Sequence, residues 1–441
     1  MEFSLNQLES AVLEDRLEAL REAVDRDVEG IRGVAPSEEV NNHVHTHYSF
    51  SPYSPTTAAY LARRSGLLAV GSVDHESIGA AREIREAAAL LGIGSTAGAE
   101  MRVSFDGTPF ADRRLNNPDS IGVAYVVLHG VPQRSVDRLK AFLAPVQAAR
   151  AERNRKQLAA LNEILTGAGI DALDYEQDIL PLSWANEGGT VTERHILYAL
   201  AIQLEEMYGR GEALLSTVEH DLGVSIGDRA RRFLSDPDNP HYLYDLLGLF
   251  KGSFVSRFFV QPGQTECPPV GEVTAFAREI GALPAYSYLG DVGDSPTGDK
   301  KAQRFEDAFL DELVAALPDL GFQAITYMPP RNTREQLRRL QRLVGDLDLI
   351  EISGVDINSS RQVFTCPEVM MPEFRHLTTT TWALIAHEHL SDADERYGLF
   401  HPDNPLGLRP LSERIEIYAG IARRADMHDP SAMVEQAPAL R

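Results

Sequence analysis

The chain has 441 residues and is 43% hydrophobic, enough apolar material for one large barrel with insertions or for two to three domains. Its formal net charge of −23 argues against binding long nucleic acids, although bound metal ions can reverse the field locally for a small phosphorylated substrate. No apolar run reaches about 18 residues, so no membrane span is expected, and the acidic N-terminus is unlike a secretory signal. Two cysteines, Cys267 and Cys366, do not make a disulfide framework, which favours a cytoplasmic location.

Residues 5–32 carry apolar side chains at helical spacing with charges between them, which predicts one or two amphipathic helices. We expect these helices either to dock on the body of the protein or to join copies into a homo-oligomer. From residue 42 the pattern changes to short apolar strands that alternate with helices, and it resumes after residue 269. This alternation predicts parallel strands wrapped by helices, an α/β fold.

Residues 135–268 interrupt this alternation, because long helical patterns replace it. We interpret the segment as a helical insertion. Residues 376–441 form a further, mostly helical segment at the end of the chain. The sequence shows no internal repeat and no low-complexity tract.

Several predicted strands end in residues that can bind a metal. In sheets of parallel strands, functional side chains lie at the C-terminal strand ends. The residues found there, strand by strand, are His43, His45 and His47, then Asp74 and His75, then Glu100, then His129, and finally Asp356. Each has an ordinary alternative, such as a helix N-cap for Asp74. Their coincidence at five strand ends predicts a metal site, because imidazole and carboxylate are common metal ligands.

The stretches HVHTHYSFSPYSP, VDHESIGAAREIREAAALLGI and AGAEM resemble the polymerase and histidinol phosphatase (PHP) family in the order, type and spacing of these residues. YVVLHGV is similar to the family's next histidine motif, and the helices of the insertion with TERHIL resemble those of its nucleotide-phosphatase-like members. The resemblance implies a distorted (β/α)7 TIM-like barrel. The expected parts are an N-terminal helical extension (1–36), the barrel in two pieces (37–134 and 269–375), the insertion (135–268) and a C-terminal segment (376–441).

The resemblance also implies a centre of two or three divalent metals. The implied ligands are His43, His45, Glu100 and Asp356 for the first metal, and the bridging Glu100 with His129 and His195 for the second. His75, with Asp74 beside it, would belong to a third site or protonate the leaving group. A bridged pair of cations would make hydroxide from a shared water and neutralise phosphate oxygens during attack.

Two positions depart from the family pattern. Tyr286 stands where the family usually has a histidine before proline, and Asn358 stands where it has a histidine after Asp356. Because these replacements remove potential ligands, we expect two metals rather than three. Histidine-rich ligation favours Mn, Fe or Zn over Mg.

Arginines of the insertion are candidates for binding substrate, because guanidinium binds phosphate in a bidentate manner, with a basic helix face or salt bridges to the abundant acidic residues as the ordinary alternative. Arg153 and Arg194 are the preferred ones. His47 lies outside the family pattern and is a candidate for contacting substrate or orienting a ligand. His387 and His389 form a second HxH without a carboxylate pattern, so we interpret them as structural or surface residues, or as substitutes for the missing histidine.

The leading hypothesis is a metal-dependent phosphoesterase, either phosphatase or phosphodiesterase, for a small phosphorylated metabolite or nucleotide. A regulatory PHP-like protein that binds metal or ligand without turnover is an alternative, motivated by Tyr286 and Asn358. A different hydrolysis on the same metals, such as C–N cleavage, is the third hypothesis.

Overall fold

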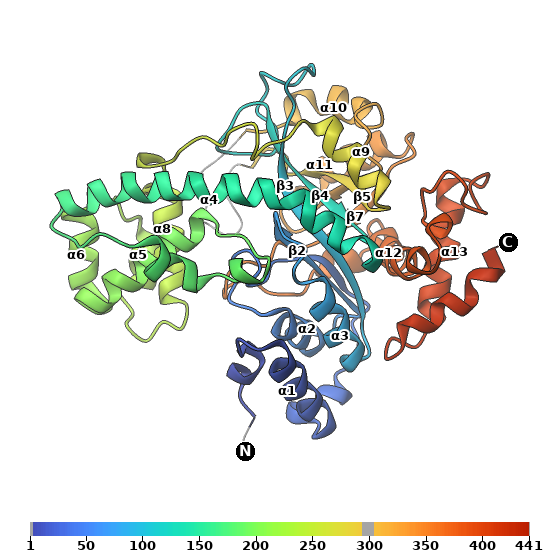
Figure 1. The fold of residues 1–441 in the computed structure, drawn as a ribbon, viewed down its shortest axis with the longest axis horizontal. Coiled ribbons are helices and arrows are strands. Elements are labelled where there is room, and N and C mark those ends of the chain that lie inside the picture. Colours follow the sequence, from blue (N-terminus) through green and yellow to red (C-terminus); the bar gives the residue numbers. More distant parts are fainter. Residues whose placement is uncertain (1–2, 293–303, 441) are drawn as a thin grey trace.

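A computed structural model describes residues 3–292 and 304–440 of the chain. Seven strands in the order β1 to β7 form one sheet at the centre of the molecule (Figure 1). The strands are β1 (Val40–Val44), β2 (Ala69–His75), β3 (Gly94–Ser104), β4 (Val123–His129), β5 (Leu283–Tyr288), β6 (Ala324–Tyr327) and β7 (Ile350–Ser353). Their near-continuous burial is typical of strands covered on both faces.

The sheet curls into a nearly closed barrel, because the chain that leaves β7 returns to β1. The amide of His45 donates to the carbonyl of Ile357 at 3.0 Å, and the amide of Ile357 donates to the carbonyl of His43 at 3.3 Å. Val44 and Ile357 form a parallel bridge between the two segments. The predicted TIM-like barrel is therefore confirmed.

One strand runs against the others. β4 is antiparallel to both β3 and β5, whereas the remaining neighbouring pairs are parallel. The expectation that all strands are parallel is therefore wrong for β4. The C-terminal end of β4 lies beside the middle of β3 and the start of β5, so a residue placed there lies below the C-terminal ends of the parallel strands.

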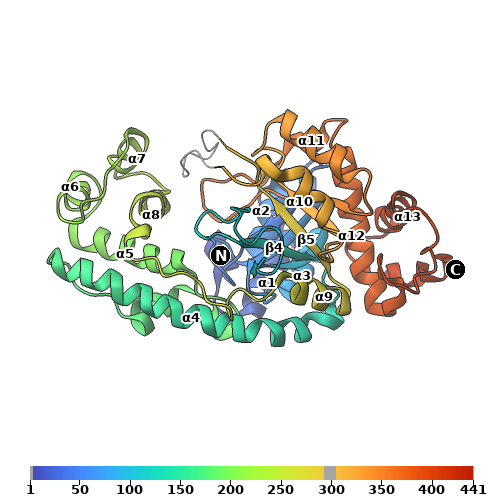
Figure 2. The same cartoon turned by 90° about the horizontal axis from the view of Figure 1, so that it is seen from above.

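Helices surround the barrel and extend from it on two sides (Figures 1 and 2). They are α1 (Leu13–Asp25), α2 (Pro55–Arg64), α3 (Ala81–Leu91), α4 (Val136–Gly167), α5 (Glu193–Tyr208), α6 (Glu212–His220), α7 (Asp228–Leu234), α8 (Tyr242–Ser253), α9 (Val270–Glu279), α10 (Leu310–Ala316), α11 (Arg334–Val344), α12 (Arg375–Ala393) and α13 (Leu411–Arg424). In the described parts of the chain, none of these helices has the length and apolarity needed to cross a membrane.

Helix α12 covers the end of the barrel where the parallel strands begin. Glu388 on α12 accepts a hydrogen bond from the amide of Ala97 on β3 at 2.9 Å, and Thr381 accepts one from the side chain of Asn42 at 2.7 Å. The approach is close, since a Cβ at Gly94 would lie 2.5 Å from the Ile385 side chain. This end of the barrel is closed, so a site open to substrate belongs at the other end.

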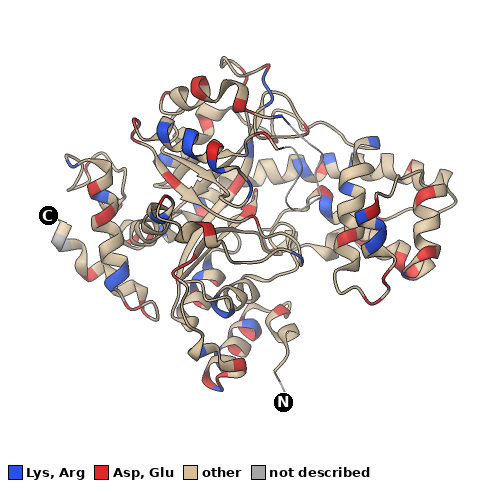
Figure 3. Cartoon of the chain, turned by 180° about the vertical axis from the view of Figure 1, so that it is seen from behind, with Lys and Arg blue, Asp and Glu red and all other residues tan. Residues whose placement is uncertain are grey.

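Helix α4 connects the barrel to a helical lobe. Leu139 and Leu143, near its start, pack in the apolar core around the barrel, whereas Leu161 and Leu165 pack in a separate core with α5 and α8. Figure 2 shows α4 running from beside the barrel to the far edge of this lobe. Acidic and basic residues are interspersed along the ribbon of both parts in the view of Figure 3.

The N-terminal helices dock on the body of the protein. Leu17 and Leu20 of α1 share an apolar core with Ile84 of α3. Beside them Arg16, fully buried, binds both carboxylate oxygens of Glu83 at 2.8 and 2.5 Å. The apolar face of α1 is thus used within the chain, and an oligomer through this segment remains a prediction.

Candidate metal centre

Histidines and carboxylates from three strands meet at the end of the barrel opposite α12. His43, His45 and Glu100 are buried, and each offers one ligand atom within 4.8 Å of the others. Nε2 of His43 and Nε2 of His45 each lie 3.9 Å from a carboxylate oxygen of Glu100. His75 places Nδ1 3.0 Å from Glu100 Oε2, and Asp356 places Oδ1 3.3 Å from His45 Nε2. These five residues are called the centre below, and their mixed nitrogen and oxygen donors suit a divalent transition metal.

The ring of His45 is held in one orientation from behind. Its Nδ1 lies 3.3 Å from the Ser49 hydroxyl, which donates to Asp74 Oδ1 at 2.7 Å. Because the hydroxyl proton goes to the carboxylate, the hydroxyl accepts from Nδ1–H, and the Nε2 lone pair faces the centre. Asp74 also accepts from the amide and hydroxyl of Thr46, both at 2.7 Å. Asp74 therefore lies behind a ligand and not among the converging ligand atoms.

The loop after β7 brings Asp356 to the centre. A Cβ at Gly354 would lie 2.4 Å from the Cβ of His43, so glycine lets the chain pass this ligand. The side chain of Asn41 donates to the carbonyl of Val355 at 3.0 Å and accepts from its amide at 2.8 Å. These contacts fix the backbone next to Asp356.

Asn358 links the centre to α5. Its Nδ2 donates to Asp356 Oδ1 at 2.5 Å, and its Oδ1 accepts from Arg194 at 2.9 Å. Burial alone would raise the pKa of Asp356, but its hydrogen bond to His45 and the charge of Arg194 help to hold that pKa well below its ordinary value. Arg194 is half-buried and is thus linked through Asn358 to Asp356, a carboxylate of the centre.

Tyr125 on β4 lies beside the centre, although the sequence did not point to it. Its ring centroid is 5.8 Å from that of His75, and it faces Arg102 in the β3–β4 ladder. Burial raises the pKa of the Tyr125 phenol, so the hydroxyl keeps its proton at neutral pH. Alternate residues of a strand point to the same face, so Tyr125 and His129 share one face of β4. Because β4 is antiparallel to β3, Tyr125 lies nearer the open end of the barrel than His129 does.

His129 lies in the barrel interior, deeper than the centre. In the ladder Leu128 faces Ala99, so His129 lies further from the open end than Glu100 does, and it pairs with Leu283 at the start of β5. Its Nε2 is buried without a hydrogen-bond partner in the described part of the chain. The converging group found among those residues does not include it.

His195 caps the start of α5. Its Nδ1 accepts the amide proton of Thr192 at 2.9 Å, and its ring stands edge-on to Phe50 with the centroids 5.0 Å apart. Burial and the nearby Arg150 lower the pKa of His195 to about 3, so the ring is neutral. In this structure Nδ1 of His195 is thus bonded to the backbone, and His195 is not among the converging ligand atoms found in the described part of the chain.

Arg153 is bound within a buried network. Its Nε and Nη2 donate to Glu266 at 2.7 and 3.0 Å, and its Nη1 donates to the carbonyl of Val260 at 3.2 Å. The arginine–glutamate network, as we call it, comprises Arg102, Arg150, Arg153, Glu76, Glu193 and Glu266. Its three positive and three negative charges cancel.

His47 points away from the converging ligands. β1 ends at Val44, so the alternation that places His43 and His45 together does not continue to His47. Nε2 of His47 lies 2.7 Å from a carboxylate oxygen of Glu9, and the ring centroid lies 5.0 Å from that of Trp184. His47 therefore ties the N-terminal extension to the loop that follows β1.

Other residues singled out in the sequence lie outside the centre. Tyr286 is buried in the apolar core, edge-on to Phe105. Nε2 of His387 on α12 bonds to the carbonyls of Gly130 and Gly281 at 3.1 and 2.9 Å. His387 thus serves the closed end of the barrel, which agrees with a structural interpretation.

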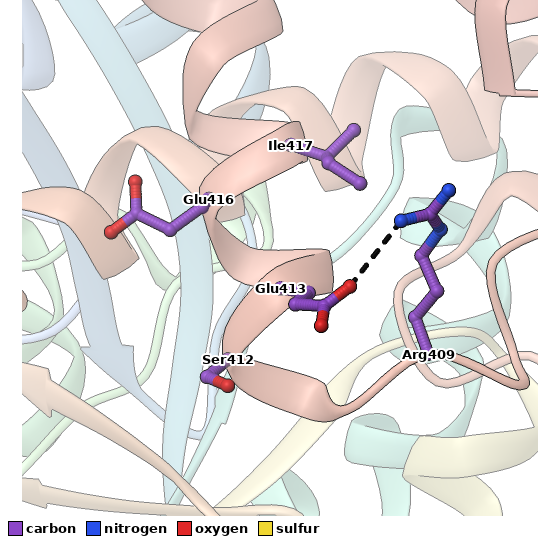
Figure 4. A pocket seen from close by; sticks show the side chains of 5 residues that line it. All are labelled: Arg409, Ser412, Glu413, Glu416 and Ile417. Atoms are coloured by element: carbon purple, nitrogen blue, oxygen red, sulfur yellow. Dashed lines mark hydrogen bonds and ion pairs between the residues drawn. The ribbon is translucent and has the colours of Figure 1, made fainter.

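An open surface depression beside α13 is lined by none of the residues of the centre (Figure 4). Arg409, Ser412, Glu413, Glu416 and Ile417 line it. Arg409 and Glu413 form an exposed ion pair of 3.3 Å, a type of contact that contributes little stability.

Comparisons with known proteins show similarity in overall structure only. No protein-family model and no curated protein matches the chain. A candidate metal-dependent phosphoesterase from Bifidobacterium adolescentis matches with a TM-score of 0.49 at 18% identity, over 76% of this chain and 93% of that one. An amidohydrolase from Chromobacterium violaceum, with sulfate bound and no metal, matches with a TM-score of 0.48 at 17% identity, over 77% and 95%. The chemistry of this chain therefore rests on the residues of its own centre.

Proposed function

We propose that this chain is a metal-dependent hydrolase of the PHP type that cleaves a phosphoester of a small phosphorylated metabolite or nucleotide. The observation that carries the proposal is the convergence of His43, His45 and Glu100, all buried, at the open end of the barrel. A buried carboxylate among imidazoles is costly unless it is paired, and a metal ion supplies that pairing. Asp356 and His75 extend the donor set to five residues.

A divalent cation held there would lower the pKa of a bound water and neutralise charge on the phosphoryl oxygens. The protein's own part is to fix the donors. Ser49 and Asp74 set the tautomer of His45, and Asn358 holds Asp356 in place. His75, whose side chain is 19% exposed, lies 3.0 Å from Glu100, where it either completes the ligand set or passes a proton to the leaving group.

Arg194 is the proposed phosphate-binding residue. Its guanidinium donates to Asn358, an amide, and so keeps donors for an anion without a strong ion pair to displace. Arg153, by contrast, donates to both oxygens of Glu266, so binding a phosphate there would require breaking a buried pair.

A second hydrolytic reaction is the alternative, because the arginine–glutamate network carries no net charge beside the centre. A site for a phosphate usually presents uncompensated positive charge, whereas hydrolysis of a C–N bond needs a polarised carbonyl and a lowered water pKa without such a surplus. Neutralisation of Arg102 and Arg150 by glutamates favours this second reaction.

Elemental analysis and activity assays test the proposal together. Purified protein loaded with Mn²⁺ or Zn²⁺ should retain metal after dialysis and release phosphate from a panel of phosphomonoesters and phosphodiesters. Glu100→Gln should lose both metal and turnover. Glu388→Gln, a change to another buried glutamate at the closed end, is the matched control and should lose neither. Metal retention with release of amine from a panel of open-chain amides, and no phosphate release, would establish the alternative.

A further inference from the structure

The two histidines that would hold a second cation do not converge with the other ligands in the part of the chain that the structure describes. His129 lies deeper in the barrel, and Nδ1 of His195 accepts the amide proton of Thr192. Neither belongs to the group of converging ligand atoms found among the described residues. The residues therefore fit one metal at the centre and do not fit the second one that the family resemblance implies.

The guanidinium of Arg150 lies between the segments that carry His75 and His195. Its Nη1 donates to Glu76 Oε2, and its Nη2 donates to Glu193 Oε2 at 2.8 Å. Glu76 directly follows His75, and Glu193 precedes His195 by two positions. The carboxylates next to both histidines are thus bound by an arginine that is 3% exposed.

The backbone at Glu76 is shaped for this contact. Its φ of 47° lies in the left-handed region, which costs energy for a residue other than glycine. Its amide donates to the carbonyl of Glu100 at 2.6 Å, which ties the corner to the centre, and its side chain is fully buried against Arg150. The ion pair with Arg150 therefore offsets both the backbone strain at Glu76 and the cost of burying the Glu76 carboxylate.

We infer that Arg150 occupies the place of a second cation, so that the chain binds one divalent metal ion and not two. The inference rests on the proposed function and specifies the number of metals at that same site. A guanidinium stays charged at every physiological pH, cannot be chelated and repels a nearby divalent ion. Arg150 thereby neutralises Glu76 and Glu193, the carboxylates that neighbour His75 and His195 in the chain, and keeps them from binding a metal.

Counting metal equivalents on the intact protein tests the inference. Metal-free protein is titrated with Mn²⁺ by calorimetry, and the metal retained after dialysis is measured by elemental analysis. One equivalent per chain in the wild type is expected. Two equivalents would overturn the inference and leave the proposed function standing. None, with either Mn²⁺ or Zn²⁺, would contradict the proposed function itself.

Substitutions then identify the residue responsible. Arg150→Met frees Glu76 and Glu193 and should raise the count from one equivalent to two, whereas Arg150→Lys should keep one. Arg153→Met is the control, because it lies on the same helix and breaks a buried pair with Glu266. It removes only the longer contact of Glu193, at 3.5 Å, and leaves the bonds of Arg150 to Glu76 and Glu193 in place. A single equivalent in folded Arg150→Met, or a second equivalent in Arg153→Met as well, would refute the role of Arg150. If Arg150→Met does not fold, the wild-type count still decides.

Discussion

Replacing Asp74 with asparagine tests whether Asp74 orients the metal ligand His45, because the substitution should change metal affinity more than it changes the stability of the fold. Oδ1 of Asp74 accepts from Ser49 and from the amide of Thr46, and Oδ2 accepts from the Thr46 hydroxyl. An asparagine oxygen can keep the first two bonds. Its amide group can donate to the Thr46 hydroxyl, which is free to rotate. Asp74→Asn therefore removes a negative charge behind His45 without deleting a hydrogen bond.

The expected loss is mainly in metal affinity. Residues that orient a metal-binding histidine typically contribute about 10- to 100-fold to affinity, or about 1.4–2.8 kcal/mol. The free energy of unfolding should change less, by about 1 kcal/mol, since weaker bonds are offset by the lower cost of burying a neutral group. Burial already raises the pKa of Asp74, which shows that this cost is present.

Calorimetric titration of metal-free Asp74→Asn with Zn²⁺, next to wild type and Glu388→Gln, measures the effect. Glu388 is also buried and bonded to the backbone, but it lies on α12 at the closed end. Its variant should bind metal as the wild type does. An unchanged dissociation constant for Asp74→Asn, or equal losses in both variants, would refute the orientation of His45 by Asp74.

Three further outcomes are expected. Burial lowers the pKa of His45, but the negative charges of Asp356, Glu100 and Asp74 outweigh burial and raise that pKa above 6.5, while the pKa of Asp356 falls below 3.8. In metal-free protein the pair of His45 and Asp356 therefore stabilises the fold between about pH 4 and 6.5. The difference in Tm between wild type and His45→Ala should shrink as the pH leaves that window. Arg16→Met should lower the free energy of unfolding in urea by about 3–5 kcal/mol, because Glu83 is left buried and unpaired. Arg194→Met should raise KM for the phosphoester about tenfold, with metal content unchanged by elemental analysis.

The barrel could be predicted because its parallel strands are short apolar runs separated by helices. The direction of β4 could not be read from its residues, since an apolar strand has the same pattern in both directions. One signal was present in the spacing. A parallel neighbour needs a crossover, usually a helix, and residues 105–122 between β3 and β4 contain no helix. Attention to that missing helix would have predicted an antiparallel strand and moved His129 away from the open end.

Three metal ligands could be predicted because they lie at the ends of parallel strands. His43, His45 and Glu100 belong to parallel strands, where the sequence places the strand ends side by side. The role of Arg153 depends instead on Glu266, 113 residues away, and no local pattern contains that contact. The tautomer of His195 likewise depends on a backbone amide and is invisible in a motif.

Charge at the centre also restricts the substrate. Among the ligands of the centre, Glu100 and Asp356 contribute two negative charges, which the one divalent ion proposed above would cancel, and the arginine–glutamate network adds none. The carboxylate of Asp74 lies behind His45 and is bonded to Ser49 and Thr46, so it does not face the reacting group. Arg194 then leaves one positive charge beside the reacting group. A single positive charge matches a phosphodiester, which carries one negative charge, better than a phosphomonoester, which carries nearly two. The diester of a given alcohol should therefore show the higher kcat/KM, and a clear preference for the monoester would show that the centre holds more positive charge than one metal ion and Arg194 supply.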